Sequence, residues 1–483
     1  MQSVSLLIGG QTTAARNAAT FDRLDPFTGE VASRAAAATL EDADAAVAAA
    51  QAAFPVWSAL PATERRKRLL RGADILDSLT PDFISVGVAE TGGTPGWYGF
   101  NVMLAANMLR EAASMTTQIT GEVIPSGVPD SMALAVRRPC GVVLGIAPWN
   151  APVILGVRAI AMPLACGNTV VLKGSELCPG VHALIGTALQ QAGLGDGVVN
   201  VILNAPADAP AIVERMIANP AVRRINFTGS TPVGRIIAQT AARYLKPVLL
   251  ELGGKAPLLV LDDADLDAAA AAANFGAFMN QGQICMSTDR IIADDRVADA
   301  FVQKLAARAT PLIAGDPRSP NVALGCMISA TAAARVDALL RDALDKGAKI
   351  ALGGGIQGSV MQPTVLDHVT SSMKIYSEES FGPIVAVIRV SSETDAIRVA
   401  NDSPFGLSAA VFTTDTARGL RVAAQIESGI CHVNGPTVHD EANMPFGGVK
   451  DSGYGRFGGK AAIAEFTDLR WITVQTGPRH YPF

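Results

Sequence analysis

Few cysteines, no basic block and no long apolar segment set this sequence apart from several classes of protein. Six cysteines occur in 483 residues, and none of them forms a CxxC pair. Disulfide-stabilised secreted domains are rich in paired cysteines, so this pattern predicts reduced thiols and a cytoplasmic protein. No apolar run approaches the roughly 18 residues that a membrane-spanning helix needs, and the N-terminus lacks the basic and apolar segments of a secretory signal. A membrane role is therefore not expected.

The charge and the histidines argue against two further classes. Lys and Arg number 39 and Asp and Glu number 44, which gives a net charge of −5 with both signs mixed along the chain. Binding to nucleic acid or to an anionic membrane surface needs a basic patch, so neither is expected. The five histidines show no HxH or HExxH spacing, and no metal site is predicted. Small molecules and further copies of the chain remain as the expected partners.

The central part of the chain has the pattern of a parallel sheet. Nearly half of all residues are hydrophobic, which is enough for two or three domains with their own cores. From residue 142, short apolar runs alternate with longer segments of helical periodicity, as expected for strands covered by helices. The predicted strands are 142–147, 168–173, 198–203, 224–228 and 247–251, and the helices between them are 152–166, 178–192, 207–218 and 231–244.

The flanking segments extend this α/β pattern. Two Ala-rich helices are predicted at 40–60, where Thr39 and Asp42 are spaced as a capping box, and at 62–79. The tail 466–475 alternates apolar and polar residues, which predicts an exposed edge strand that could pair with another subunit, and 121–138 is interpreted in the same way. A second α/β block is predicted from 257 to about 430, with helices 265–279, 297–309 and 330–346 and a strand at 384–390.

Polar residues or glycines follow four of the five predicted strands. Ligands of a doubly wound sheet bind at the carboxyl ends of its strands, so these groups should converge on one cleft. The four groups are Pro148-Trp149-Asn150, Lys173-Gly174-Ser175-Glu176, Phe227-Thr228-Gly229-Ser230 and Glu251-Leu252-Gly253-Gly254.

Two of these groups suit a nucleotide, although each also has a structural explanation. Gly229 and Ser230 open a predicted helix whose free N–H groups could hold a phosphate, or they form an ordinary turn. Lys173 and Glu176 could bind the two hydroxyls of a ribose, or they form a solvated ion pair. The residues by themselves leave both alternatives open.

Two further residues suit acid–base and nucleophilic chemistry. Glu251 ends an apolar strand, where it is either a general base with a pKa raised by burial or a carboxylate held by a cap or a salt bridge. Cys285 lies in FMNQGQICMSTDR, between Ile284 and Met286, and is either a buried core thiol or a nucleophile. The other five cysteines are interpreted as core residues.

Seven motifs, found in order over essentially the whole chain, resemble those of the NAD(P)-dependent aldehyde dehydrogenases. Within this family the likeness is greatest to the aromatic aldehyde branch, the salicylaldehyde, vanillin and benzaldehyde dehydrogenases, and residues 431–483 most resemble the salicylaldehyde dehydrogenases. The motifs are PWN at Pro148, KGSE at Lys173, FTGS at Phe227, ELGGK at Glu251, GQIC ending at Cys285, EESFGP at Glu378 and MPFGGVKDSGYGR at Met444.

The resemblance implies an α/β fold of the aldehyde dehydrogenase type. Such a fold has a Rossmann-type dinucleotide-binding domain, an α/β catalytic domain and a small β extension for oligomerisation, and it implies a homodimer or a dimer of dimers. The corresponding domain limits here are 1–120 with 140–251, then 252–450, and finally 121–139 with 465–483.

The resemblance also implies a mechanism and a cofactor. The Cys285 thiolate would attack an aldehyde, Asn150 and the Cys285 N–H would hold the oxyanion, and hydride would pass to a nicotinamide. Glu251 would activate the water that hydrolyses the thioester, which favours hydrolysis over transfer to coenzyme A. NAD is expected, with NADP as a weaker alternative, because the Glu176 carboxylate would repel a 2′-phosphate. The residues expected around the cofactor are Ile146, Pro148, Trp149, Lys173, Ser175, Glu176, Gly229, Ser230, Leu252, Glu379 and Phe381.

The expected substrate pocket has features of its own. Many relatives carry an aromatic residue after PWN, whereas this chain has Ala151, which leaves room for an aromatic ring. Arg158 lies two turns after Asn150 and either binds an oxygen substituent of the substrate or is a surface or interface arginine. The expected pocket residues are Trp97, Phe100, Met103, Leu155, Arg158, Ile284, Met286 and Phe446.

The expected substrate is an aromatic aldehyde, salicylaldehyde or a related hydroxybenzaldehyde, as in aromatic hydrocarbon catabolism. Two alternatives stay open. One is an enzyme for aliphatic aldehydes or semialdehydes, and the other is a non-catalytic binding protein on the same fold.

Overall fold

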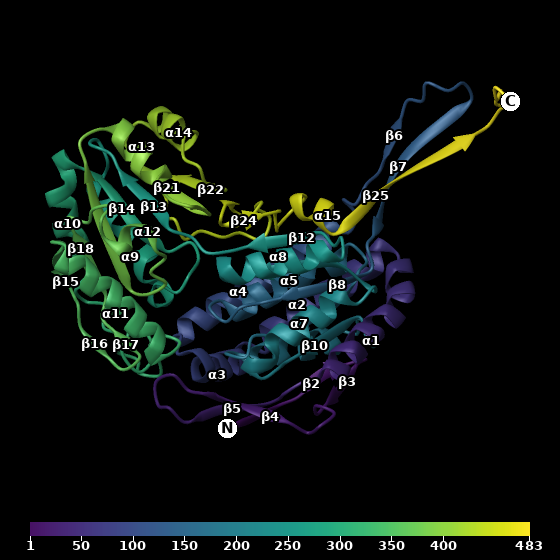
Figure 1. Ribbon diagram of the computed structural model, residues 1–483, viewed down its shortest axis with the longest axis horizontal. Helices are drawn as coiled ribbons and strands as arrows, with labels where there is room; N and C mark the ends of the chain where they lie inside the picture. Colours follow the sequence, from purple (N-terminus) through teal and green to yellow (C-terminus); the bar gives the residue numbers. More distant parts are fainter.

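Two large sheets and a projecting three-stranded sheet organise the chain in the computed structural model, which describes residues 1–483 (Figure 1). The larger sheet has eight strands, and its central five run parallel. In order across the sheet they are β24 (Gly453–Tyr454), β12 (Val248–Glu251), β11 (Val222–Thr228), β8 (Val142–Ile146), β9 (Thr169–Lys173), β10 (Val199–Ile202), β2 (Leu6–Ile8) and β3 (Gln11–Thr13).

Helices cover both faces of this sheet and complete the first lobe. The most central is α5, and all of its residues are buried because its sequence PVILGVRAIAMPLA is apolar on every side except at Arg158. The capping box at Thr39 and Asp42 is present at the start of α1. The helices of this lobe are α1 (Leu40–Ala59), α2 (Ala62–Ser78), α3 (Thr80–Thr91), α4 (Pro95–Met115), α5 (Pro152–Ala165), α6 (Pro179–Gln191), α7 (Ala209–Ala218) and α8 (Thr231–Arg243).

The second lobe is built on a seven-stranded sheet that is parallel except for its edge strand β15. Its strands, in order, are β15 (Lys349–Leu352), β18 (Thr364–Asp367), β19 (Ile384–Val390), β14 (Thr288–Asp294), β13 (Ala256–Val260), β21 (Ser408–Phe412) and β22 (Ile430–Val433). Its helices are α9 (Leu266–Phe278), α10 (Asp295–Ala309), α11 (Ala330–Asp345), α12 (Lys374–Ser377), α13 (Glu393–Asn401) and α14 (Thr416–Ala423).

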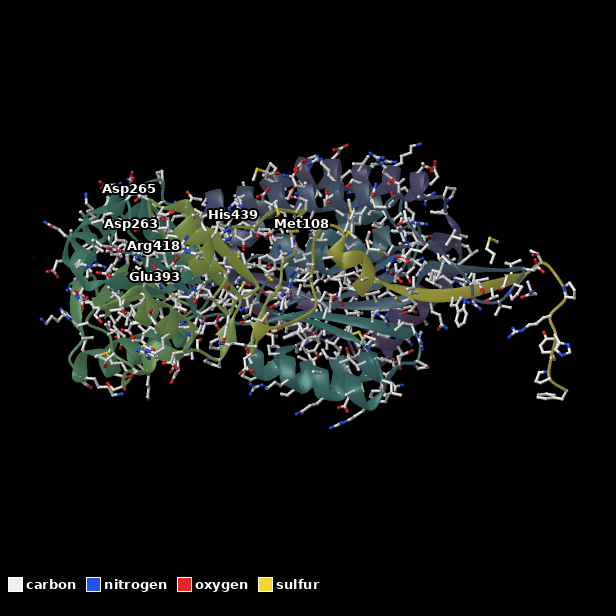
Figure 2. All side chains as sticks on the ribbon, turned by 90° about the horizontal axis from the view of Figure 1, so that it is seen from above. Met108, Asp263, Asp265, Glu393, Arg418 and His439 are labelled. Carbon is white, nitrogen blue, oxygen red and sulfur yellow. The ribbon has the colours of Figure 1, made fainter.

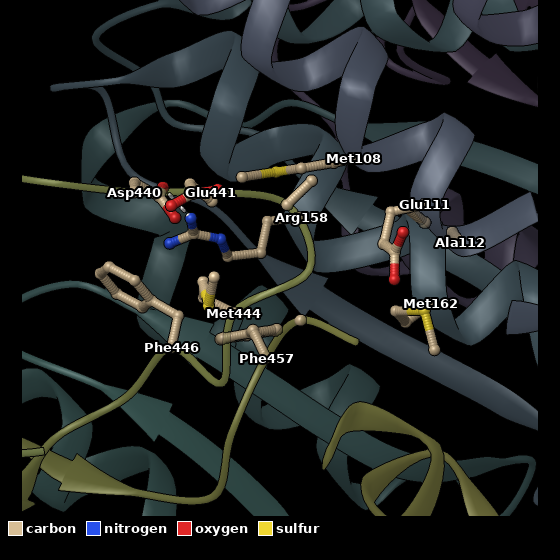
Figure 3. Close-up of a pocket in the computed structure, with 13 residues that line it drawn as sticks. Met108, Glu111, Ala112, Arg158, Met162, Asp440, Glu441, Met444, Phe446 and Phe457 are labelled. Atoms are coloured by element: carbon tan, nitrogen blue, oxygen red, sulfur yellow. Dashed lines mark hydrogen bonds and ion pairs between the residues drawn. The ribbon is translucent and has the colours of Figure 1, made fainter. Parts of the chain in front are cut away.

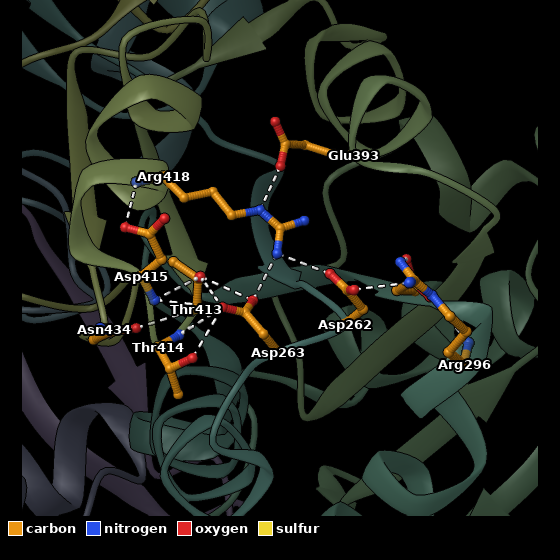
Figure 4. A network of polar contacts seen from close by, with 10 residues as sticks. Asp262, Asp263, Arg296, Glu393, Thr413, Thr414, Asp415, Arg418 and Asn434 are labelled. Atoms are coloured by element: carbon orange, nitrogen blue, oxygen red, sulfur yellow. Dashed lines mark hydrogen bonds and ion pairs between the residues drawn. The ribbon is translucent and has the colours of Figure 1, made fainter.

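A polar network ties two helices of the second lobe to the end of β13 (Figure 4). Arg418 of α14 pairs with Glu393 of α13 at 2.6 Å and with both Asp262 and Asp263 at 2.8 Å. Asp263 also accepts hydrogen bonds from the hydroxyl of Thr413, at 2.7 Å to its nearer oxygen. One arginine therefore links β13, α13 and α14, which come from separate parts of the chain.

The third sheet projects away from both lobes (Figure 1). It pairs β25 (Thr467–Gln475) with β7 (Ser131–Pro139) and β7 with β6 (Glu122–Ile124), all antiparallel. One edge of β25 has no partner strand, and its Leu469 and Trp471 are 63% and 75% exposed. The smaller elements are β1 (Gln2–Val4), β4 (Thr20–Leu24), β5 (Val31–Ala36), β16 (Ile356–Gln357), β17 (Val360–Met361), β20 (Phe405–Gly406), β23 (Val449–Lys450) and α15 (Ala461–Glu465).

The chain crosses between the lobes and then returns. After β22 a long segment runs back to the first lobe, where β24 pairs antiparallel with β12. Seen from above, His439 of this return segment lies between the second lobe, marked by Arg418, and helix α4, marked by Met108 (Figure 2). The domain limits at 251 and 450 stay predictions, but the return segment, residues 434–448, lies where the two lobes meet.

Every predicted helix and strand is present, with ends within two residues of those predicted. The alternating tail and the segment 121–138 are strands of the same projecting sheet. No helix combines the length and the apolar composition that crossing a membrane requires.

Candidate active site

Cys285 lies just beyond α9, after a tight turn at Asn280, Gln281 and Gly282. All three residues have positive φ values, of 48°, 55° and 67°, a conformation that costs energy for the two residues with side chains. The turn is held because the Asn280 amide donates to the backbone oxygen of Asn150 at 2.9 Å. Glycine is required at position 282, since a Cβ there would clash with the carbonyl oxygen of Gly382. The half-buried thiol is thereby fixed between the two lobes.

Two cavities meet at Cys285, and Asn150 and Leu155 line both of them. The first has a volume of about 390 Å3, within the range of small-molecule sites. Most of its walls are apolar. Besides Cys285 and Asn150, the residues that line it are Trp97, Phe100, Leu104, Ala151, Ile154, Leu155, Arg158, Phe275, Met279, Ile284, Met286, Pro436, Val438, His439, Asp440 and Phe446.

Seven of the eight predicted pocket residues line this cavity, and Met103 does not. Met103 is 51% exposed on the outside of α4. Trp97, Phe100 and Leu104 are spaced three and four residues apart, so they share the helix face that meets the cavity, whereas Met103 is turned away from it. Placing Met103 in the pocket was therefore wrong, and Leu104 occupies that position.

The second cavity, of about 270 Å3, lies at the carboxyl ends of the parallel strands. It joins groups that were predicted from separate motifs, together with Arg335 from the second lobe, which no motif indicated. Besides the three residues at the junction, its lining residues are Pro148, Trp149, Thr228, Gly229, Ser230, Glu251, Leu252, Gly253, Arg335, Glu379 and Phe381.

Four residues predicted around the cofactor do not line this second cavity. Ile146 is buried in β8. Lys173 ends the neighbouring strand β9, and its ammonium lies 3.3 Å from the Glu176 carboxylate. Ser175, between them, donates its backbone N–H to His182. These polar groups stand at the same edge of the sheet, one strand further along.

Glu251 is a buried carboxylate without a partner. It ends β12 and is fully buried, and neither of its carboxylate oxygens accepts a hydrogen bond. Burial raises the pKa of Glu251 to about 7, although the positive charge of Arg158 opposes this. Burial, followed by the nearby Glu251 carboxylate, raises the pKa of the Cys285 thiol well above its usual value. Near neutral pH, a protonated thiol thus lies close to a carboxyl group that is about half ionised.

Asn150 is held by the turn that carries Cys285. Its backbone oxygen also accepts from the Trp97 indole N–H at 3.1 Å. Its side-chain amide donates one N–H to the carbonyl oxygen of Gln283 at 3.0 Å. An amide has two such donors, so the second stays available beside the thiol.

Glu379 and its neighbours fix the mouth of the second cavity. The Glu379 carboxylate accepts a hydrogen bond of 2.9 Å from the backbone N–H of Gly254, and burial raises the pKa of Glu379 to about 7. A Cβ at Gly253 would stand 2.8 Å from this carboxylate and would have to displace it. Phe381 packs edge-on against Trp149, with ring centroids 5.7 Å apart.

The chain matches the sequence model of the Aldehyde dehydrogenase family over residues 13–472. It belongs to the aldehyde dehydrogenase family. This membership confirms the family predicted from the seven motifs and the α/β fold of that type, and it makes the protein an oxidoreductase that acts on aldehydes with NAD or NADP.

Three relatives show where this aldehyde dehydrogenase stands within its family. It is 67% identical to a vanillin dehydrogenase of Pseudomonas fluorescens over 482 residues, which cover both chains in full. It is 51% identical to a salicylaldehyde dehydrogenase of Pseudomonas putida over 96% of each chain. The crystal structure of a salicylaldehyde dehydrogenase from Pseudomonas putida G7, complexed with salicylaldehyde, superposes with a TM-score of 0.98 at 49% identity and full coverage of both chains.

Proposed function

We propose that this aldehyde dehydrogenase oxidises a hydroxylated aromatic aldehyde, such as vanillin or salicylaldehyde, to its carboxylate. The observation that carries this proposal is the cavity of aromatic and aliphatic walls that ends at Cys285. Ala151 at the position after Asn150 leaves its inner end open to a ring. The high identity to a vanillin dehydrogenase supports the same substrate class.

NAD fits the residues of the second cavity. The first turn of α8 offers backbone N–H groups, and its N-cap residue Ser230 makes no side-chain cap bond to them, so they suit a pyrophosphate. Lys173 and Glu176 suit the hydroxyls of the adenosine ribose, and Glu379 suits those of the nicotinamide ribose. When bound, NAD supplies the oxidant, since its nicotinamide ring accepts the hydride from the carbon that Cys285 holds.

The residues at the junction divide the chemistry between them. Cys285 attacks the aldehyde carbon as its thiolate, after its proton is lost to solvent, and the new carbon–sulfur bond holds the substrate beside Asn150. The oxyanion is held by the free N–H of the Asn150 amide and by the Cys285 backbone N–H. Once the thioester has formed, Glu251 deprotonates a water molecule that hydrolyses it, and the carboxylic acid leaves.

A panel of aldehydes at saturating NAD tests the proposed substrate class. Vanillin, salicylaldehyde and benzaldehyde should have kcat/KM values at least about tenfold above those of hexanal and succinic semialdehyde, because only aromatic rings fill the apolar cavity. NADH formation is the measurement. A higher kcat/KM for hexanal or succinic semialdehyde would favour the aliphatic alternative, and no NADH with any aldehyde would favour the non-catalytic one.

Cofactor preference is a separate prediction. We expect kcat/KM for NAD to exceed that for NADP at equal concentrations, because the Glu176 carboxylate would repel the 2′-phosphate. Glu176→Gln should lower the ratio of kcat/KM for NAD to kcat/KM for NADP by about tenfold, since it removes the charge of the side chain and keeps its shape. Glu122→Gln, on the projecting sheet, is the matched control. A wild-type preference for NADP would contradict the prediction.

We also propose that the projecting sheet pairs with a second copy of the chain. The support is the unpaired edge of β25 and the exposure of Leu469 and Trp471 on it. A homodimer or a dimer of dimers, and a cytoplasmic location, stay predictions.

A further inference from the structure

We propose that Asp440 sets the charge preference of the substrate cavity by neutralising Arg158. The cavity would then select uncharged aldehydes and disfavour those that carry a carboxylate. The inference rests on the proposed function only in treating this cavity as the aldehyde site. It concerns Asp440, which lies outside the seven sequence motifs.

Charge is scarce in this cavity. Arg158 and Asp440 are the only charged side chains that line it, apart from the titratable His439. Arg158 comes from the middle of α5, where every neighbour along the helix is buried, and it is 6% exposed. A cation in such surroundings attracts an anion strongly, because little water is present to screen it.

The structure supplies that anion from within the chain. An Arg158 Nη2 N–H donates to Asp440 Oδ2, and the two charges form an ion pair (Figure 3). The Asp440 side chain is 9% exposed, and its other oxygen is buried without a hydrogen-bond partner. The pair is thus shielded from solvent and balances to zero net charge.

Phe446 limits how the guanidinium group can be approached. The central carbon of the Arg158 guanidinium lies over the Phe446 ring, 4.1 Å from the ring centroid. Asp440 accepts from an N–H of Nη2, so part of the hydrogen-bonding capacity of the guanidinium is already used within the chain. Asp440 and Phe446 both belong to the return segment, which therefore fixes the orientation of Arg158 twice.

The neighbouring carboxylate does not share this role. Glu441 follows Asp440 directly and lines with it the small pocket drawn in Figure 3, but it makes no ion pair with Arg158, is half-exposed and lies 2.9 Å from His439. It carries the same charge as Asp440 in a solvated position, which makes it a matched control. A substrate carboxylate entering the cavity would meet the Asp440 charge and an arginine already in use, whereas a phenol or an ether would meet no net charge.

The test compares two substrates that differ only in charge. The ratio of kcat/KM for 4-carboxybenzaldehyde to that for benzaldehyde is measured for the wild type and for Asp440→Asn. Asp440→Asn frees Arg158 to bind the carboxylate, so the ratio should rise at least about tenfold. Glu441→Gln should leave the ratio within about twofold of wild type. A ratio that does not rise in Asp440→Asn, or equal losses with both substrates, would overturn the proposal.

Two further variants separate charge from folding. The double substitution Arg158→Met with Asp440→Leu removes both charges and should return the ratio to within about threefold of wild type. Arg158→Met alone leaves the Asp440 anion and should lower the ratio, and this comparison decides the matter if Asp440→Asn does not fold. An unchanged ratio in Arg158→Met would then refute the role of the pair.

Failure of the proposed function gives a different result. If the wild type prefers aliphatic aldehydes, the same comparison is made with succinic semialdehyde against butanal. A rise in that ratio for Asp440→Asn would support the role of Asp440 while the aromatic substrate class is rejected.

Discussion

Cys285→Ser is expected to lose aldehyde oxidation by a factor on the order of 10³ or more while the protein stays folded. The serine hydroxyl matches the thiol in shape but is a far weaker nucleophile at neutral pH. The surroundings add to the loss of nucleophilicity, because burial and the Glu251 carboxylate already raise the pKa of the Cys285 thiol and would act in the same way on a serine hydroxyl. The change is measured as NADH formation with vanillin and benzaldehyde at saturating NAD.

Cys140→Ser is the matched control for this substitution. Cys140 is also half-buried, and burial raises its pKa to about 12, but it lies at the far end of β8 from the cavities. It should keep near wild-type activity. Near-native oxidation by Cys285→Ser, with an unchanged thermal midpoint, would remove Cys285 from the role of nucleophile.

Glu251→Gln is expected to stop turnover after the first oxidation. Attack and oxidation should still yield close to one NADH per active site, because Cys285 and Asn150 remain. The later steady state should be slower by about 10²–10⁴, since no base deprotonates the hydrolytic water. Rapid mixing with an excess of aldehyde separates the burst from the steady state. A variant with full steady-state activity would place the base elsewhere.

The pH dependence gives the same residue a second test. Only the ionised carboxylate accepts a proton, and the pKa of Glu251 is raised to about 7. Where hydrolysis limits the rate, wild-type kcat should therefore fall as the pH drops below about 7, and this fall should be absent from the residual rate of Glu251→Gln.

The same pKa shift predicts a change in stability. The carboxyl of Glu251 ionises near 4.5 in the unfolded chain, so the free energy of unfolding of the wild type should decrease as the pH rises from 4.5 to about 7. Glu251→Gln should lessen that decrease in thermal denaturation, and the part that comes from Glu379, whose pKa is also raised to about 7, should remain.

The sequence predicted the elements well because their periodicity is local. Short apolar runs between helical segments fixed β8 to β12, and the strand-end residues Asn150, Ser230 and Glu251 then had to meet at one edge of the sheet. The place of Cys285 beside them depended on the motif resemblance, because a single thiol is more often a core residue.

Contacts between distant segments were the part that could not be predicted. Asp440 lies 282 residues from Arg158, and nothing in the spacing of either indicates that they meet. Arg335 reaches the second cavity from a different lobe. Met103 was misplaced for a smaller reason, since an apolar residue one position from the correct helix face has the same composition as one on it.

The return segment also bears on how the substrate range of such an enzyme can change. Cys285, Asn150 and Glu251 are held by a tight turn and by sheet ends, which tolerate little alteration. His439, Asp440 and Phe446 instead lie in irregular chain outside the two large sheets. Substitutions in this segment can change the shape and charge of the cavity wall while Cys285, Asn150 and Glu251 stay in place. The chemistry and the choice of aldehyde can therefore evolve separately, with the segment that closes the chain back onto its first lobe acting as the variable part.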